Sequence, residues 1–79
     1  MMIEFMPHNQ LQKLREKYME GTRIHLMHME DIQAPEDGSY GTVSHVDDAG
    51  FIHVRWDNGS GLSLVEGLDS FEIVEEENQ

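Results

Sequence analysis

Cysteine is absent from this chain of 79 residues. Without thiols the protein has no disulfide bonds, no thiolate metal ligands and no cysteine nucleophile. Small secreted domains usually depend on disulfide bonds, so their absence favours a cytoplasmic protein. Basic residues are also scarce: five lysine and arginine residues stand against sixteen aspartate and glutamate residues, and the net charge is −11. We therefore expect no direct binding to nucleic acids or to anionic membranes, which attract positive charge.

Long hydrophobic runs are absent as well. No stretch approaches the roughly 18 apolar residues of a membrane span. The start of the chain, MMIEFMPHNQ, has neither the basic residues nor the apolar run of a signal peptide. A domain of this size buries only about 60% of the surface that its unfolded chain exposes, so a deep pocket is difficult to build. We expect one small domain that is not an enzyme and uses no cofactor.

Residues 1–20 predict an N-terminal arm followed by a short amphipathic helix. Asn9 is placed to cap the first turn, and Gly21 is placed to end the helix. The apolar stripe of this helix consists of Leu11, Leu14 and Tyr18. A helix of about ten residues is marginally stable alone, so the stripe must pack on another surface. That surface is either the chain's own β-domain or a partner, such as a second copy of the chain.

Residues 21–74 change to a period of two, which is typical of β-strands with one buried face. We expect five short strands, at residues 22–28, 40–46, 51–56, 62–65 and 71–74. One face of the first strand should carry Ile24, Leu26 and His28. Residues 29–39 form a long acidic loop. The dipeptide Asn58-Gly59 predicts a type I′ hairpin turn, and residues 67–70 predict a single tight turn.

This order of elements predicts a mainly β fold. We expect a small five-stranded SH3-like barrel at residues 21–74, an N-terminal α-helix before it and an acidic tail at residues 75–79. The alternative is an oligonucleotide-binding type of barrel, but that fold normally has a helix between its third and fourth strands. Only a few turn residues lie at that place in this chain.

The same region contains short motifs in a fixed order. The most specific are Gly38-x-x-Gly41-Thr42-Val43, Val46-Asp47-Asp48-x-Gly50 and Ile52-His53-Val54-x-Trp56-Asp57-Asn58-Gly59. In order and spacing, the motifs of residues 21–74 resemble domain-of-unknown-function family 4314, a small bacterial family often carried by phages and mobile elements. The resemblance implies a small SH3-like barrel in such a setting, and it implies no activity. The N-terminal helix lies outside the resembling region.

Three histidines lie on adjacent expected strands, at His25, His45 and His53. They would form a histidine face if the strand register brings them together, and three imidazoles are a known zinc-binding set. No cysteine completes such a set here, and we assign no metal site. The aspartates of the two hairpin turns lack the spacing of a calcium-binding EF-hand, and turn chemistry explains them. No serine stands in the G-x-S-x-G context of a hydrolase nucleophile.

The predicted barrel carries two basic residues against ten acidic ones, a net charge of −8. An acidic surface either serves solubility or suits a basic protein partner. We expect a protein-interaction module whose binding surface combines the acidic loop with two aromatic residues: Glu30, Asp31, Glu36, Asp37, Tyr40 and Trp56. The first alternative is an acidic inhibitor that mimics nucleic acid and occupies the basic channel of a host defence enzyme. The second is a small-ligand or metal binder that uses the histidine face. A homodimer is compatible with each of these functions.

Overall fold

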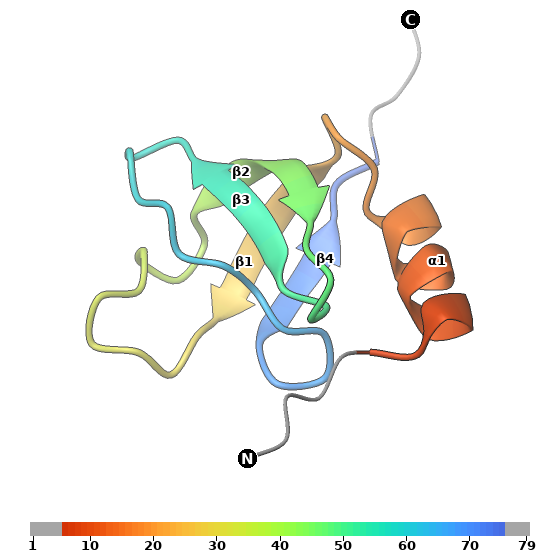
Figure 1. Ribbon diagram of the computed structural model, residues 1–79. Coiled ribbons are helices and arrows are strands. Elements are labelled where there is room, and N and C mark those ends of the chain that lie inside the picture. Colours follow the sequence, from red (N-terminus) through yellow and green to blue (C-terminus); the bar gives the residue numbers. More distant parts are fainter. Residues whose placement is uncertain (1–5, 76–79) are drawn as a thin grey trace, which may run out of the picture.

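The computed structural model describes residues 6–75, so most of the predicted arm and tail lies outside the described residues. Within that range the chain forms one helix, α1 (His8–Lys17), and four strands, β1 (Arg23–His28), β2 (Tyr40–Val46), β3 (Ile52–Trp56) and β4 (Ser70–Ile73). The strands make a single open antiparallel sheet in the order β3-β2-β1-β4, and α1 lies beside it (Figure 1). The mainly β prediction is therefore confirmed. No helix in this part of the chain is long and apolar enough to cross a membrane.

Helix α1 begins two residues earlier than the capping pattern predicted. Pro7 occupies the cap position, and no side chain caps the first turn. Asn9 lies inside the helix, where its Oδ1 accepts a hydrogen bond from the neighbouring Gln10 N–H (3.0 Å), so its prediction as the cap is wrong. Pro7 has a φ of −55°, close to the helical value, and its carbonyl accepts from Leu11 N–H at 2.9 Å. The fixed proline ring thus starts the helix without a side-chain cap.

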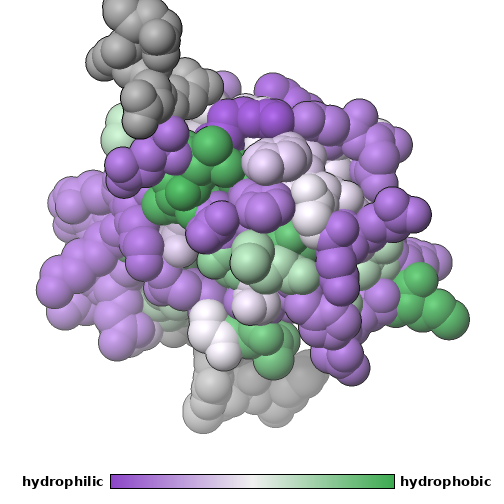
Figure 2. All heavy atoms as spheres, turned by 180° about the vertical axis from the view of Figure 1, so that it is seen from behind, coloured by the Kyte–Doolittle hydropathy of each residue, from purple (hydrophilic) through white to green (hydrophobic). Residues whose placement is uncertain are grey.

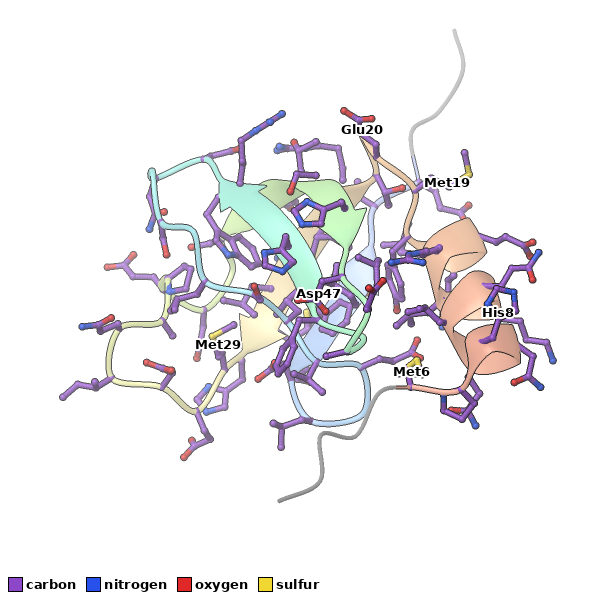
Figure 3. All side chains as sticks on the ribbon, in the orientation of Figure 1. Met6, His8, Met19, Glu20, Met29 and Asp47 are labelled. Carbon is purple, nitrogen blue, oxygen red and sulfur yellow. The ribbon has the colours of Figure 1, made fainter. Side chains whose placement is uncertain are left out.

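The predicted apolar stripe of α1 packs on the chain's own sheet. Its three members are each no more than 7% exposed and belong to the same hydrophobic core as the strands: Leu11, Leu14 and Tyr18. The Tyr18 ring also contacts the ring of Phe71 on β4, with centroids 5.7 Å apart. At the beginning of the helix Met6 lies near the β2–β3 turn (Figure 3), close enough that a Cβ at Gly50 would meet its Cε. The helix therefore closes one side of the core.

The two β-hairpins use the same kind of turn. In each, a single glycine takes a positive φ, 92° at Gly50 and 93° at Gly59, and no other residue type does so among residues 6–75. A type I′ turn needs positive φ at both central residues, so its prediction at Asn58-Gly59 is wrong. Asn58 instead accepts a hydrogen bond from Ser60 N–H through its side chain (2.9 Å). Asp47 does the same in the other turn, where its Oδ1 accepts from the backbone N–H of Ala49 at 3.0 Å.

The predicted strand at residues 62–65 does not form a regular ladder. Leu64 bridges to Ile52 through two backbone hydrogen bonds of 2.9 and 2.8 Å, and Trp56 N–H donates to the Ser60 carbonyl at 3.1 Å. A continuous ladder would pair Leu62 between these two points. The Leu62 carbonyl instead accepts from the indole Nε1–H of Trp56 at 2.8 Å. The segment consequently contributes an isolated bridge, and the five-strand prediction is replaced by four strands.

Candidate functional site

The predicted acidic loop, residues 29–39, joins β1 to β2. Two backbone hydrogen bonds close its base, from Leu26 N–H to the Ser39 carbonyl (2.8 Å) and from Gly38 N–H to the Leu26 carbonyl (2.7 Å). Gly38 has a φ of 91°, a conformation that side-chain-bearing residues rarely adopt. Met29, which Figure 3 shows at the end of β1, is 7% exposed and belongs to the core. The loop therefore projects from a fixed base.

All four predicted loop carboxylates are exposed: Glu30, Asp31, Glu36 and Asp37. Asp31 also shapes the loop, because its Oδ1 accepts a hydrogen bond from Gln33 N–H at 2.8 Å. The next residue, Ile32, has a fully exposed side chain, at 100% relative accessibility. Ile32 was not among the residues selected from the sequence, although a lone aliphatic residue inside an acidic loop is a visible signal. The loop thus combines negative charge with an isolated apolar side chain.

His28 connects the two ends of the loop. Its Nε2 lies 2.7 Å from a carboxylate oxygen of Glu30, and its Nδ1 lies 3.1 Å from a carboxylate oxygen of Asp37. Both ring nitrogens donate only in the protonated imidazolium. The pKa of His28 is accordingly raised, because Glu30 first and Asp37 second accept hydrogen bonds from the charged ring.

The sequence pattern placed His28 on the buried face, and that placement is wrong. The register between β1 and β4 shifts between Leu26 and His28, and the His28 side chain is 53% exposed. The shift turns the imidazole toward solvent and toward the carboxylates of the loop. An irregularity of this kind has no signature in the alternation of apolar residues, so His28 could not be selected from sequence.

Tyr40, the first residue after the loop, is 43% exposed. Its ring stacks on that of His25, with centroids 4.6 Å apart and planes at 13°. The Arg23 guanidinium lies 5.7 Å from the same ring and binds both carboxylate oxygens of Asp57 at 2.9 Å. His25 Nδ1 is 3.0 Å from the Glu72 carboxylate. The Tyr40 ring is therefore half-exposed on the outer face of the sheet, and its contacts with His25 and Arg23 restrict its orientation.

Trp56 lies in the core and is therefore not a residue of the candidate binding surface. Its side chain faces inward with Val54, both at 3% exposure. Its only polar atom is used in the hydrogen bond to the Leu62 carbonyl. An indole in this position offers no surface to a partner, so the structure does not bring Trp56 together with Tyr40.

The three histidines of the predicted histidine face do not form one cluster. His45 and His53 stack on each other, with ring centroids 4.3 Å apart. His25 stacks on Tyr40 instead. His53 Nε2 lies 2.8 Å from Asp47, which Figure 3 labels near the end of β2. Among residues 6–75 no group of three histidine or carboxylate side chains is arranged to hold a metal ion.

Asp47 is tied into its own hairpin. Partial burial raises its pKa, but hydrogen bonds from His53 and from the backbone N–H groups of Phe51 and Ala49 outweigh that effect and leave the pKa lowered. The carboxylate is thus held ionised by local turn structure, and the neighbouring imidazole is one of the groups that hold it.

Five of the acidic residues outside the loop have a cationic or histidine partner. The pairs are Asp47–His53, Asp48–Arg15, Asp57–Arg23, Glu66–Lys17 and Glu72–His25. Within the loop, His28 contacts Glu30 and Asp37 in the same way, so the acidic charge is distributed over the loop and the rest of the surface. Figure 2 shows the molecule from behind, where hydrophilic residues cover most of the surface and the hydrophobic areas are small and separate. No continuous apolar face competes with the loop in this view.

These features define a small, mainly β domain with one helix and a projecting acidic loop. The family model for the domain of unknown function (DUF4314) matches residues 7–74, and the chain belongs to this family. The match begins before α1, so the helix is part of the family domain and the resemblance extends further than the motifs indicated. Searches of the curated proteins and of the solved structures found no match.

Proposed function

We propose that this protein is a non-enzymatic interaction module that binds a basic protein through its acidic loop. The observation that carries the proposal is Ile32, whose fully exposed side chain lies between Glu30 and Asp31 on one side and Glu36 and Asp37 on the other. An apolar centre with a polar, solvent-accessible rim is the usual anatomy of a protein–protein interface. The proposed partner surface is an apolar recess with a basic rim.

The base of the loop supports this proposal. The backbone hydrogen bonds at Gly38 and Ser39 restrict the loop before any partner arrives, and a preorganised loop loses less conformational entropy on binding. The carboxylates would increase the association rate with a basic partner in a salt-dependent manner. Tyr40, at the end of the loop, supplies a further aromatic contact.

An acidic inhibitor that occupies a nucleic-acid channel is the second candidate. The net charge of −11 and the phage or mobile-element setting implied by the family resemblance favour it. A mimic of a nucleic acid would spread charge over an extended surface and needs no apolar centre, whereas the loop combines its carboxylates with the exposed side chain of Ile32. That combination favours the compact interaction module.

We further propose that the sheet is the core of an SH3-like barrel. The isolated bridge between Leu64 and Ile52 adds a fifth segment beside β3, and the resulting spatial order is residues 62–64, β3, β2, β1, β4. In this order β4, the last strand of the chain, pairs with β1, the first, so the two ends of the sheet-forming region lie side by side as in a small antiparallel barrel. The proposed cytoplasmic location and the possible homodimer remain compatible with this arrangement.

The test is affinity capture from a bacterial lysate at about 50 mM and about 500 mM salt, followed by binding of the purified captured protein to variants. Ile32→Ser should weaken that binding at least about tenfold, equivalent to about 1.4 kcal/mol. Glu36→Gln should weaken it only at low salt, because its charge acts over distance. Leu68→Ser is the matched control, since Leu68 is 78% exposed in a different loop. Equal binding by the Ile32 and Leu68 variants, or no capture at either salt, would refute the proposal.

A further inference from the structure

Strand β4 is the outermost strand of the sheet at one edge. The pairing of β4 with β1 places Glu72 opposite His25, and Val74 N–H donates to the Arg23 carbonyl at 2.9 Å. Hydrogen-bonded positions alternate along an antiparallel strand, so the N–H and C=O groups of Phe71 and Ile73 point away from β1. Among residues 6–75, no backbone hydrogen bond outside the regular strand pairings reaches these four groups. The edge therefore presents a short row of free donors and acceptors.

Among residues 6–75, no helix or strand occupies the position of a further strand beside β4. Of the described helices and strands, only β1 packs its backbone against β4. Figure 1 shows α1 on the same side of the molecule, but the helix meets β4 through the Tyr18 and Phe71 side chains on the inner face of the sheet. The helix therefore covers the inner face of the sheet at this point, and none of the described elements covers the backbone edge of β4.

The charges around this edge indicate what kind of chain it accepts. Glu72 lies on β4 itself, and the exposed Glu75 follows two residues after the strand. The sequence continues with Glu76 and Glu77. No lysine or arginine lies in residues 56–79. An added strand with lysine or arginine side chains beside these carboxylates would gain favourable cross-strand pairs.

A second copy of the protein fits this edge poorly. Antiparallel pairing of two β4 strands would bring the Glu72 carboxylates of the copies close together, and like charges across a strand pair are destabilising. The net charge of −11 on each chain adds long-range repulsion. A basic partner strand meets neither the cross-strand repulsion of the carboxylates nor the long-range repulsion between two acidic chains.

We propose that the free edge of β4 binds an extended, basic segment of a partner protein as an additional strand. The main-chain groups of Phe71 and Ile73 provide the hydrogen bonds, and the acidic residues Glu72 and Glu75 select for basic side chains. This mode of binding is β-strand addition, in which the backbone supplies affinity and alternate side chains supply specificity. The edge is a separate surface from the acidic loop and does not depend on the function proposed for it.

The experiment uses the full chain and an acetylated, amidated peptide of alternating lysine and valine, about eight residues long, which spans a strand. Amide hydrogen exchange is measured by NMR. At saturation the Phe71 and Ile73 amides should exchange at least about tenfold more slowly, because both become hydrogen-bonded. A peptide with proline in place of each valine, which lacks half of the donors, should give no protection. A peptide with glutamate in place of lysine should not bind.

Two variants separate the edge from other surfaces. Glu75→Lys, at an exposed position, should weaken peptide binding at least about tenfold, whereas Glu36→Gln in the acidic loop should leave it unchanged. Ile73→Pro removes an edge-facing N–H without removing a bond to β1 and should abolish protection at Phe71 if the variant keeps its far-UV circular dichroism spectrum.

Three results would overturn the proposal. The first is the absence of binding by the lysine–valine peptide, and the second is binding that protects loop amides while leaving Phe71 and Ile73 unprotected. The third is protection of these two amides that rises with protein concentration in the absence of peptide, because the edge would then be occupied by a second copy.

Discussion

Gly41 on β2 provides the sharpest test of the packing beneath the sheet. It is buried and pairs with Trp56 across the β2–β3 ladder. A Cβ at this position would lie 2.5 Å from Val54 Cγ1, 2.8 Å from Trp56 Cε3 and 3.1 Å from the Arg55 carbonyl oxygen. Real Cβ atoms do not approach other heavy atoms so closely, so Gly41→Ala must displace the indole or the Val54 methyl group. The indole is fixed by its hydrogen bond to Leu62 and has little freedom to move.

The size of the effect follows from the cost of overpacking. Forcing one extra methyl group into a filled core destabilises a protein by about 1–3 kcal/mol. For a domain of this size each kcal/mol lowers the melting temperature by about 4–8 °C. Gly61→Ala is the matched control, because a Cβ there meets nothing within 4 Å and Gly61 does not have a positive φ. That control should be neutral or stabilising by up to about 1 kcal/mol, since alanine restricts the unfolded chain.

The measurement is urea unfolding followed by far-UV circular dichroism, because the fluorescence of Trp56 is itself affected by the substitution. In a double-mutant cycle, Gly41→Ala combined with Val54→Ala should lose less stability than the two single losses together, by about 0.5 kcal/mol or more, since the second change removes one of the clashing groups. The reasoning about this site is refuted if Gly41→Ala and Gly61→Ala have the same unfolding midpoint and slope.

Three further predictions concern other parts of the fold. Trp56→Phe keeps an aromatic ring but leaves the Leu62 carbonyl without its donor, so the free energy of unfolding should fall by about 1–3 kcal/mol in urea titrations. The control is Tyr40→Phe at an exposed ring, which should change the free energy of unfolding by less than about 0.5 kcal/mol. The pKa of His28 is raised above its ordinary value of 6.5, so its contribution to stability is fully present from about pH 5 to 6.5 and is lost as pH rises through the folded-state pKa. The difference in melting temperature between the protein and His28→Asn should shrink over that rise, and a constant difference would contradict a stabilising role for the contacts of His28 with Glu30 and Asp37. A fragment of residues 21–79 should lack the cooperative thermal transition of the full chain, because it loses the buried side chains of Leu11, Leu14 and Tyr18, which each contribute about 1.5–3 kcal/mol of apolar burial. A cooperative transition in the fragment would show that the sheet folds without its helix.

The parts of the fold that follow from apolar periodicity could be predicted from the sequence. The inward faces of β1 and β3 are carried by Ile24 and Leu26 and by Ile52, Val54 and Trp56, all at 3% exposure or less. The apolar stripe of α1 is equally regular. In each case the alternation of side chains is dictated by the geometry of the element, so the sequence alone contains the information.

The remaining features depend on single polar groups whose partners lie elsewhere in the chain. The strand expected at residues 62–65 is interrupted because the Trp56 indole donates to the Leu62 carbonyl. The outward turn of His28 depends on a register shift against β4. The exposure of Ile32 depends on how the loop is held at its base. Of the candidate site, the sequence could therefore identify the acidic loop and Tyr40, whereas His28 and Ile32 required the fold and Trp56 was misplaced.

The hydrogen bond from the Trp56 indole to the Leu62 carbonyl also makes the two edges of the sheet differ in how well they can pair with another strand. Beside β3, the bonds of Ile52 to Leu64 and of Trp56 to Ser60 occupy the backbone, and the indole fills the space between them. An incoming strand finds no uninterrupted row of partners on that side. Repetitive edge-to-edge assembly needs two open edges on every molecule, since each copy must receive one neighbour and offer itself to the next. With one receptive edge, any pairing ends after a single strand has been added. If β4 binds an extended partner as proposed, the domain takes up one such segment at a fixed stoichiometry and does not propagate into fibres.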